Sequence, residues 1–225
     1  MRHNLDLRAE YTVRVRKLLA TVLVLGGALG AASHATAQNI TPPTTPAIIT
    51  PPAGNSAFLL GNGVGTQGYV CLPQGAGASW TVNGARPEAT LFQTFFGQEI
   101  QIITHFLSPN TNPAQNAPNP LPFGNATWQS SVDSSKVWAQ TLHSIAAGSG
   151  PSCPNAGAIG CLLLQSIGSL QGPTGGKVLT KTTFIQRLNT KGGSATADGC
   201  ATTADVGKQV LVPYTADYYF CRGDE

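Results

Sequence analysis

The segment K-V-L-T-K-T-T-F-I-Q-R-L, from Lys177 to Leu188, has the clearest strand pattern in the chain. Successive side chains of a β-strand point to opposite faces of a sheet, so the even-numbered and odd-numbered residues of this segment form two faces. Both faces carry apolar and polar residues. The pattern therefore predicts a long strand whose surroundings change along its length. The Asn- and Gly-containing residues 189–193 that follow predict a turn.

Shorter runs of β-branched and aromatic residues, separated by Gly, Pro and Asn, recur on both sides of this segment. They predict further strands over residues 66–72, 79–82, 89–96, 99–106, 127–132, 137–145, 161–170, 209–214 and 217–221. Many short strands joined by turns are typical of an all-β domain, here a single β-sandwich or small barrel. Residues 140–147 also fit a short helix, and residues 107–125 and 149–160 are expected to be long irregular loops.

The first 37 residues have the pattern of a secretory signal. A basic flank ends at Lys17, residues 18–25 are almost purely apolar, and the tripeptide ending at Ala37 is a typical signal peptidase site. The apolar run is too short to span a bilayer comfortably, and nothing similar follows it. We therefore expect a secreted protein, located in the periplasm, at the cell surface or outside the cell, without a transmembrane segment in the mature chain. Residues 38–56, rich in Pro and Thr, predict a solvated N-terminal arm, and residues 57–225 a single β-rich domain.

The charge of the expected mature chain is balanced. The chain carries 13 Lys and Arg and 10 Asp and Glu; five of the former and two of the latter precede Gln38, which leaves eight of each sign. Such a chain lacks the basic surface that nucleic acid requires. We expect no nucleic-acid partner.

The five cysteines, all after residue 37, favour disulfides in an exported protein. Cys153 and Cys161 flank a flexible loop and can form a local bridge. Of Cys71, Cys200 and Cys221, one must stay unpaired or pair between chains. No cysteine or histidine spacing predicts a zinc site, so neither a metal nor a cofactor is expected.

Several short motifs have ordinary explanations. Residues 63–68 match G-x-G-x-x-G, but a strand follows where the dinucleotide fingerprint needs a helix, which indicates a Gly-rich turn. The tripeptide 222–224 spells the cell-adhesion sequence Arg-Gly-Asp, at a chain end where chance explains it. Asn39 and Asn125 fit the glycosylation acceptor, which matters only in a glycosylating host. An exposed pair among the Trp and Tyr residues would form a platform for a sugar ring.

His105 and His143 are the histidines of the expected mature chain. His105 ends the predicted strand 99–106, where the Pro- and Asn-rich loop begins. An imidazole there can be a base, a metal ligand or a structural donor, and a lone His at a strand end is most often structural. Two His with Asp133 would form a metal site only if the fold brought them together.

The C-terminal half contains the run F-I-Q-R-L-N-T-K-G-G at 184–193, G-C at 199–200, and V-P-Y-T-A-D-Y-Y-F at 212–220. This combination resembles the domain-of-unknown-function family 3455, secreted proteins of bacteria and fungi. Looser matches upstream include T-H-F ending at Phe106, T-W ending at Trp128, and D-S-S-K-V starting at Asp133, so the resemblance covers about residues 66–221. It implies export, one β-rich domain, a family bridge between Cys71 and Cys200, an added bridge between Cys153 and Cys161, and Cys221 as the free thiol. It implies no activity.

These observations favour a binding or envelope-associated module, whose partner is a small molecule or a carbohydrate. The alternative is an extracellular hydrolytic or metal-assisted enzyme with His105, Trp128 and Asp133 at one rim, and a third reading is a surface component tethered through residues 38–56. We further predict that Asp133 accepts a hydrogen bond from His105 and thereby raises the pKa of the imidazole.

Overall fold

The computed structural model describes residues 40–111 and 124–224, with the backbone alone for residues 83–87. The predicted signal peptide, its cleavage site, the acceptor Asn39 and much of the 107–125 loop lie outside the described residues.

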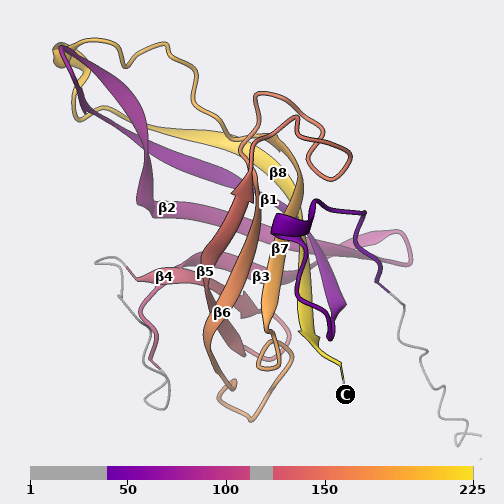
Figure 1. Cartoon of the computed structure of the whole chain (residues 1–225). Helices are drawn as coiled ribbons and strands as arrows, with labels where there is room; N and C mark the ends of the chain where they lie inside the picture. The colour runs from indigo at the N-terminus through magenta and orange to yellow at the C-terminus, as the bar shows by residue number, and fades with distance from the viewer. Residues whose placement is uncertain (1–39, 112–123, 225) are drawn as a thin grey trace, which may run out of the picture. The chain divides into compact units, whose positions relative to one another are not determined.

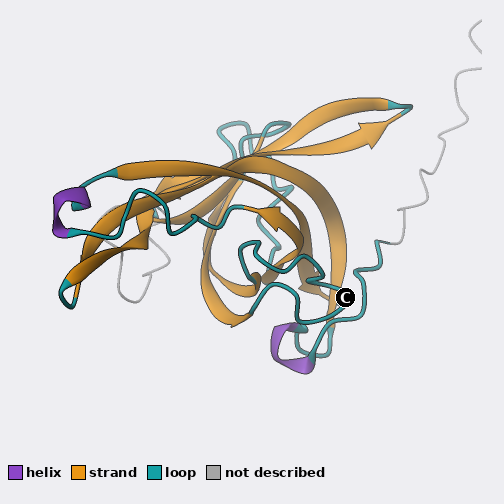
Figure 2. Ribbon diagram, turned by 90° about the horizontal axis from the view of Figure 1, so that it is seen from above, coloured by secondary structure: helices purple, strands orange, loops and turns teal. Residues whose placement is uncertain are grey.

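Eight antiparallel strands form a closed barrel in which each strand pairs with its sequence neighbours and β8 pairs with β1 (Figure 1). The ring of strands is visible from above in Figure 2. Closure gives every strand a partner on both sides, which removes free sheet edges. The elements are η1 (Ala47–Ile49), β1 (Asn55–Gln74), β2 (Gly77–Phe95), β3 (Gln98–Ser108), β4 (Asn125–Ser130), β5 (Lys136–Ile145), β6 (Cys161–Leu170), β7 (Phe184–Gly192), η2 (Thr203–Asp205) and β8 (Gln209–Gly223).

The prediction of an all-β domain is confirmed, and of its two forms the barrel is the one adopted. Several predicted short strands are segments of longer ones: 79–82 and 89–96 both belong to β2, and 209–214 and 217–221 both belong to β8. β8 pairs with β1 through residues 215 and 216, which looked like a break, and β2 pairs with β1 on both sides of a register shift between Val82 and Pro87. Pairing with a neighbouring strand therefore outweighed the local turn signal. Residues 140–145 lie in β5, so the helical alternative there is wrong.

The strand predicted over 177–188 begins only at Phe184. The preceding residues are irregular because side chains bind their backbone donors: the amide of Val178 donates to Asp133 Oδ2 at 2.9 Å, and the amide of Leu179 donates to Ser135 Oγ at 3.0 Å. Leu179 is completely buried in the main core. The local alternation was therefore overridden by contacts with the β4–β5 turn.

The main core fills part of the barrel. Cross-strand neighbours such as Leu91 and Ile103, or Ile185 and Phe220, are fully buried against one another. Gly63 lies where this packing leaves no room for a side chain, since a Cβ on it would come within 2.7 Å of the Tyr218 ring. The G-x-G part of residues 63–68 thus belongs to strand β1 and reflects close packing, not a turn or a nucleotide site.

A second apolar cluster joins the N-terminal segment to the barrel strands. Ile49 is completely buried, and its cluster includes Leu163, Leu188 and Tyr219. The side-chain amide of Gln186 donates to the Ile49 carbonyl at 2.8 Å. The expectation of a solvated arm is therefore wrong at Ile49, whereas the domain boundary at residue 57 stays a prediction.

Two disulfides cross-link the chain. Cys71 is bonded to Cys200 and Cys153 to Cys161, with Cα separations of 5.7 and 5.9 Å, the same pairs that the family resemblance implied. Cys221 is a buried free thiol, and burial raises its pKa to about 12. This thiol is therefore protonated at neutral pH, which makes it a poor nucleophile.

Candidate ligand-binding cavity

A cavity of about 840 Å³ lies among side chains from all eight strands. Pockets that hold small organic molecules have volumes of about 300–1,000 Å³, so the space suits one such ligand. The lining continues to Val82 of β2 and to Ser194, in the loop before β8. The cavity thus reaches the base of the β1–β2 hairpin.

Most of the cavity wall is apolar. Leu107, Leu162 and Leu164 line it from β3 and β6, and Ile159 lines it from the loop before β6. Ala139 on β5 also lines it and is 1% exposed. A small side chain at this inward position leaves space that a larger residue would occupy.

His105 and Trp128 are cross-strand neighbours on β3 and β4, and both line the cavity. Their rings stack with centroids 4.2 Å apart and planes inclined by 6°. His105 Nδ1 lies 2.9 Å from the Thr127 carbonyl oxygen, so Nδ1 carries a proton and donates it. In the neutral ring Nε2 is then an acceptor.

The pKa of His105 is lowered to about 4, mainly by burial and also by the nearby charge of Arg187, although the bond to Thr127 acts in the opposite direction. The prediction of a raised pKa is therefore wrong. It assumed a carboxylate partner, but the imidazole is buried against aromatic rings and bonded to a neutral carbonyl, so desolvation of the charged form dominates.

Asp133 belongs to a different part of the molecule. It lies in the β4–β5 turn, where its carboxylate accepts hydrogen bonds from the amide of Ser135 at 3.0 Å, the hydroxyl of Ser135 at 2.7 Å and the amide of Val178 at 2.9 Å. Burial would raise its pKa, but these bonds outweigh it and lower the pKa to about 2. The predicted bond to His105 is therefore wrong: the structure brings His105 to Trp128, and Asp133 instead holds the loop before β7.

Arg187 is the basic residue of the cavity lining. It lies on β7 between two cross-strand neighbours that also line the cavity, Leu162 and Tyr218. Its Nη2 donates to the Gly160 carbonyl at 2.8 Å, whereas its Nε is buried without a hydrogen-bond partner. Among the described residues it forms no ion pair with a carboxylate.

Sequence reasoning quoted Arg187 only as part of a family motif and did not select it as a site residue. The sequence nevertheless contained a signal. Charged residues make up 10% of the chain, and Arg187 falls on the same strand face as the apolar Ile185. A cation on the inward face of a barrel is unusual and indicates a function.

Further polar groups of the lining lack partners. Asn125 and Trp128 are each 1% exposed, and neither the Asn125 amide nor the Trp128 Nε1 has a hydrogen-bond partner. Buried polar groups in folded proteins are normally paired, so unpaired ones on residues that line a cavity favour a nearby ligand or water as their partner. Burial also removes Asn125 as a glycosylation acceptor in the folded chain.

Tyr218 also lines the cavity and forms a hydrogen bond with Tyr214. Tyr214 and Tyr218 have their hydroxyl oxygens 2.7 Å apart, and burial raises both pKa values, most strongly for Tyr214. Both are therefore protonated at neutral pH. One hydroxyl donates to the other, which leaves one proton available for a further acceptor.

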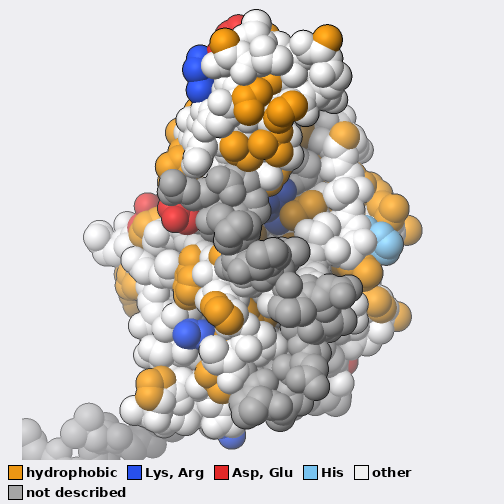
Figure 3. Space-filling model, turned by 90° about the vertical axis from the view of Figure 1, so that its left-hand side faces the viewer, with side chains coloured by type: hydrophobic (Ala, Val, Ile, Leu, Met, Phe, Trp, Pro, Cys, Tyr) orange, Lys and Arg blue, Asp and Glu red, His pale blue; other side chains and the backbone are white. Residues whose placement is uncertain are grey.

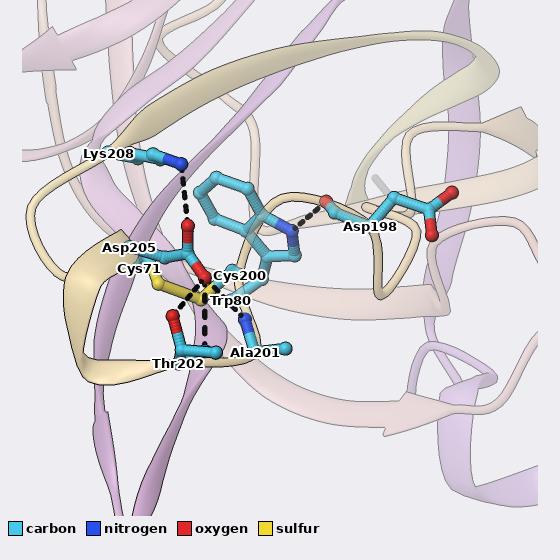
Figure 4. Close-up of polar contacts among 8 residues, drawn as sticks. All are labelled: Cys71, Trp80, Asp198, Cys200, Ala201, Thr202, Asp205 and Lys208. Carbon is cyan, nitrogen blue, oxygen red and sulfur yellow. Dashed lines mark hydrogen bonds and ion pairs between the residues drawn. A yellow bond between two sulfur atoms is a disulfide. The ribbon is translucent and has the colours of Figure 1, made fainter.

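The hairpin above the cavity is fastened to the loop that precedes β8 (Figure 4). The Cys71–Cys200 bridge joins them, and Trp80 Nε1 donates to the Asp198 carbonyl at 3.2 Å. Tyr69 adds a bond from its hydroxyl to the Gly193 carbonyl at 2.7 Å. Hydrophobic side chains gather on the upper part of the face shown in Figure 3, and a basic side chain lies in a recess below them.

In residues 40–111 and 124–224, no group of three or more His, Cys, Asp and Glu side chains has the arrangement needed to hold a metal ion. In the same part of the chain, no helix is long and apolar enough to cross a membrane.

The family model described as a protein of unknown function (DUF3455) matches residues 52–222. No curated protein and no solved structure matches the chain significantly. The matched region contains all eight strands almost completely, both disulfides and every lining residue that the structure describes. The chain therefore belongs to the DUF3455 family.

Proposed function

We propose that this protein is a binding protein that holds a small, largely apolar molecule inside its barrel. The observation that carries the proposal is the cavity of about 840 Å³ whose lining residues include buried polar atoms without partners, on Asn125, Trp128 and Arg187. An eight-stranded barrel is wide enough to hold one small ligand when its interior is incompletely filled. A ligand with one or two polar atoms would satisfy the unpaired groups, and its apolar part would contact the leucines of the wall.

The alternative of an enzyme with His105 and Asp133 at one rim has less support. Asp133 is fully engaged by Ser135 and Val178, so it does not orient the imidazole. His105 is held by its stack on Trp128 and its bond to Thr127. This arrangement suits a rigid wall of a binding site.

We also propose that the protein acts outside the cytoplasm. The pattern of residues 1–37 indicates export. The two disulfides agree with this, because such bonds persist mainly in oxidising compartments.

The binding proposal is tested with the neutral fluorescent probe N-phenyl-1-naphthylamine, whose emission rises in apolar surroundings. We expect saturable binding to the wild-type protein. Replacing Ala139 with Phe fills the cavity and should weaken binding at least about tenfold, as expected if the ring occupies the ligand's space. The matched control is Ala146→Phe, because Ala146 is exposed and does not line the cavity.

If Ala139→Phe does not fold, Ala158→Phe provides the same test, because Ala158 lines the cavity from a loop. Probe binding that is unchanged in a folded cavity-filled variant would refute the proposal. The proposal would also be refuted if the wild-type protein bound neither this probe nor any aliphatic ligand.

A further inference from the structure

The charges around the cavity have a single sign. Arg187 is positive, and the lining residues that the structure describes include no Asp or Glu. His105 also lines the cavity, but its pKa of about 4 makes it neutral at pH 7. The described part of the lining therefore carries one net positive charge and no compensating carboxylate.

The guanidinium of Arg187 is only partly satisfied. One bond goes to the Gly160 carbonyl and another to the Tyr218 hydroxyl, whereas the buried Nε has no partner. A guanidinium removed from water without an anion is costly, and it has the planar set of donors that binds a carboxylate through two parallel bonds. The neighbouring Tyr218 can contribute a hydroxyl proton to the same anion, provided that Tyr214 donates to Tyr218.

We propose that the ligand of this cavity is an amphiphilic carboxylate whose anionic group binds Arg187 and whose hydrocarbon part lies against the apolar wall. The wall beside Arg187 fits this orientation: Leu162 is its cross-strand neighbour, and Leu164 lies one inward position further along β6. This inference rests on the proposed function, since it specifies the ligand of the same cavity.

A carboxylate fits better than a phosphate. Among the described lining residues there is one cation, Arg187, and one positive charge balances the single charge of a carboxylate. A phosphate monoester carries nearly two negative charges at neutral pH, and sites for it usually combine several positive groups or backbone donors.

The experiment compares dodecanoate, dodecanol and dodecyl phosphate as competitors of N-phenyl-1-naphthylamine. These ligands share one chain and differ only in the polar group. We expect dodecanoate to bind the wild-type protein at least about tenfold more tightly than dodecanol, as expected for a hydrogen-bonded charge pair. In Arg187→Met, which removes the charge and keeps an unbranched stem, that preference should disappear while dodecanol affinity stays within about twofold.

The matched control is Arg222→Met. Arg222 is exposed on β8, where its guanidinium lies 5.7 Å from the centre of the Phe58 ring, and it does not line the cavity. This variant should retain the wild-type preference for dodecanoate.

The outcomes separate the two proposals. If neither the probe nor any of the three ligands binds, the proposed function itself fails. If dodecanol binds as tightly as dodecanoate, the cavity is a ligand site but the carboxylate assignment is wrong, and this wild-type result holds even if Arg187→Met does not fold. Tighter binding of dodecyl phosphate than of dodecanoate would likewise overturn the carboxylate assignment.

Discussion

His105 lies flat against Trp128, with ring centroids 4.2 Å apart. The two residues face each other across β3 and β4, and the imidazole is anchored to the Thr127 carbonyl on the same strand as its stacking partner. Offset aromatic pairs of this kind contribute about 0.5–1.5 kcal/mol beyond the area that they bury. The pair therefore forms a fixed part of the cavity wall, in which a neutral imidazole is favoured.

The neutral state of His105 predicts that stability falls in mild acid. Its pKa is about 4 in the folded protein and about 6.5 when unfolded, so the unfolded chain binds the proton more readily. The free energy of unfolding should be undiminished above pH 6.5 and should fall as the pH drops from about 6.5 to about 4, by at most about 3 kcal/mol. Urea denaturation across this range measures it.

His105→Phe supplies the control, because it keeps an aromatic ring against Trp128 but does not titrate. Its stability should be nearly independent of pH over the same range. A wild-type protein whose unfolding free energy does not change between pH 7 and pH 5 would contradict the neutral, buried imidazole.

Asp133 is predicted to stabilise the fold without affecting ligand binding. Asp133→Ala leaves the amides of Val178 and Ser135 without their acceptor, which should cost about 1–3 kcal/mol in the free energy of unfolding. Binding of N-phenyl-1-naphthylamine should stay within about twofold. A large loss of binding in a stable variant would instead place Asp133 at the ligand site.

Asp198→Ala is the matched control for Asp133. Asp198 is exposed, and it accepts the Trp80 bond through its backbone carbonyl, which the substitution retains. Its unfolding free energy should change by less than about 0.5 kcal/mol.

The adjacent residues Ile48 and Ile49 should respond very differently to truncation. Ile49 is completely buried, whereas Ile48 is 52% exposed. Ile49→Ala should lower the free energy of unfolding by about 2–4 kcal/mol and Ile48→Ala by less than about 1 kcal/mol. Equal, small effects in a denaturant titration would mean that the segment before β1 does not pack on the barrel.

Gly63 should not tolerate a methyl group. A Cβ there would come within 2.7 Å of the Tyr218 ring, which lines the cavity. Gly63→Ala should therefore cost about 1–3 kcal/mol in unfolding free energy and also weaken ligand binding, because Tyr218 must shift. Gly223→Ala is the control, since the nearest atom to a Cβ at Gly223 is 4.0 Å away. Wild-type stability in Gly63→Ala would contradict this packing.

The accuracy of the strand predictions did not follow the clarity of the local pattern. The prediction of 161–170 coincides with β6, and that of 137–145 differs from β5 by one residue. The prediction of 177–188 failed over its first half because side chains of the β4–β5 turn bind that backbone. Local alternation is visible in a sequence, whereas a contact between residues 45 positions apart is not.

By itself the sequence determined the all-β class, because β-branched residues in short runs between Gly and Pro favour strands wherever they fold. It also determined the family membership, because long and specific motifs can be recognised in a sequence without knowing which residues they contact. Only the tertiary structure decided that Arg187 lines a cavity, that Asp133 binds the backbone of the loop before β7, and that burial lowers the pKa of His105. These properties depend on which side of the closed sheet a residue faces and on what surrounds it there. Both the direction in which a residue faces and its surroundings follow from closure of the barrel between β1 and β8, which pairs residues that are far apart in the chain.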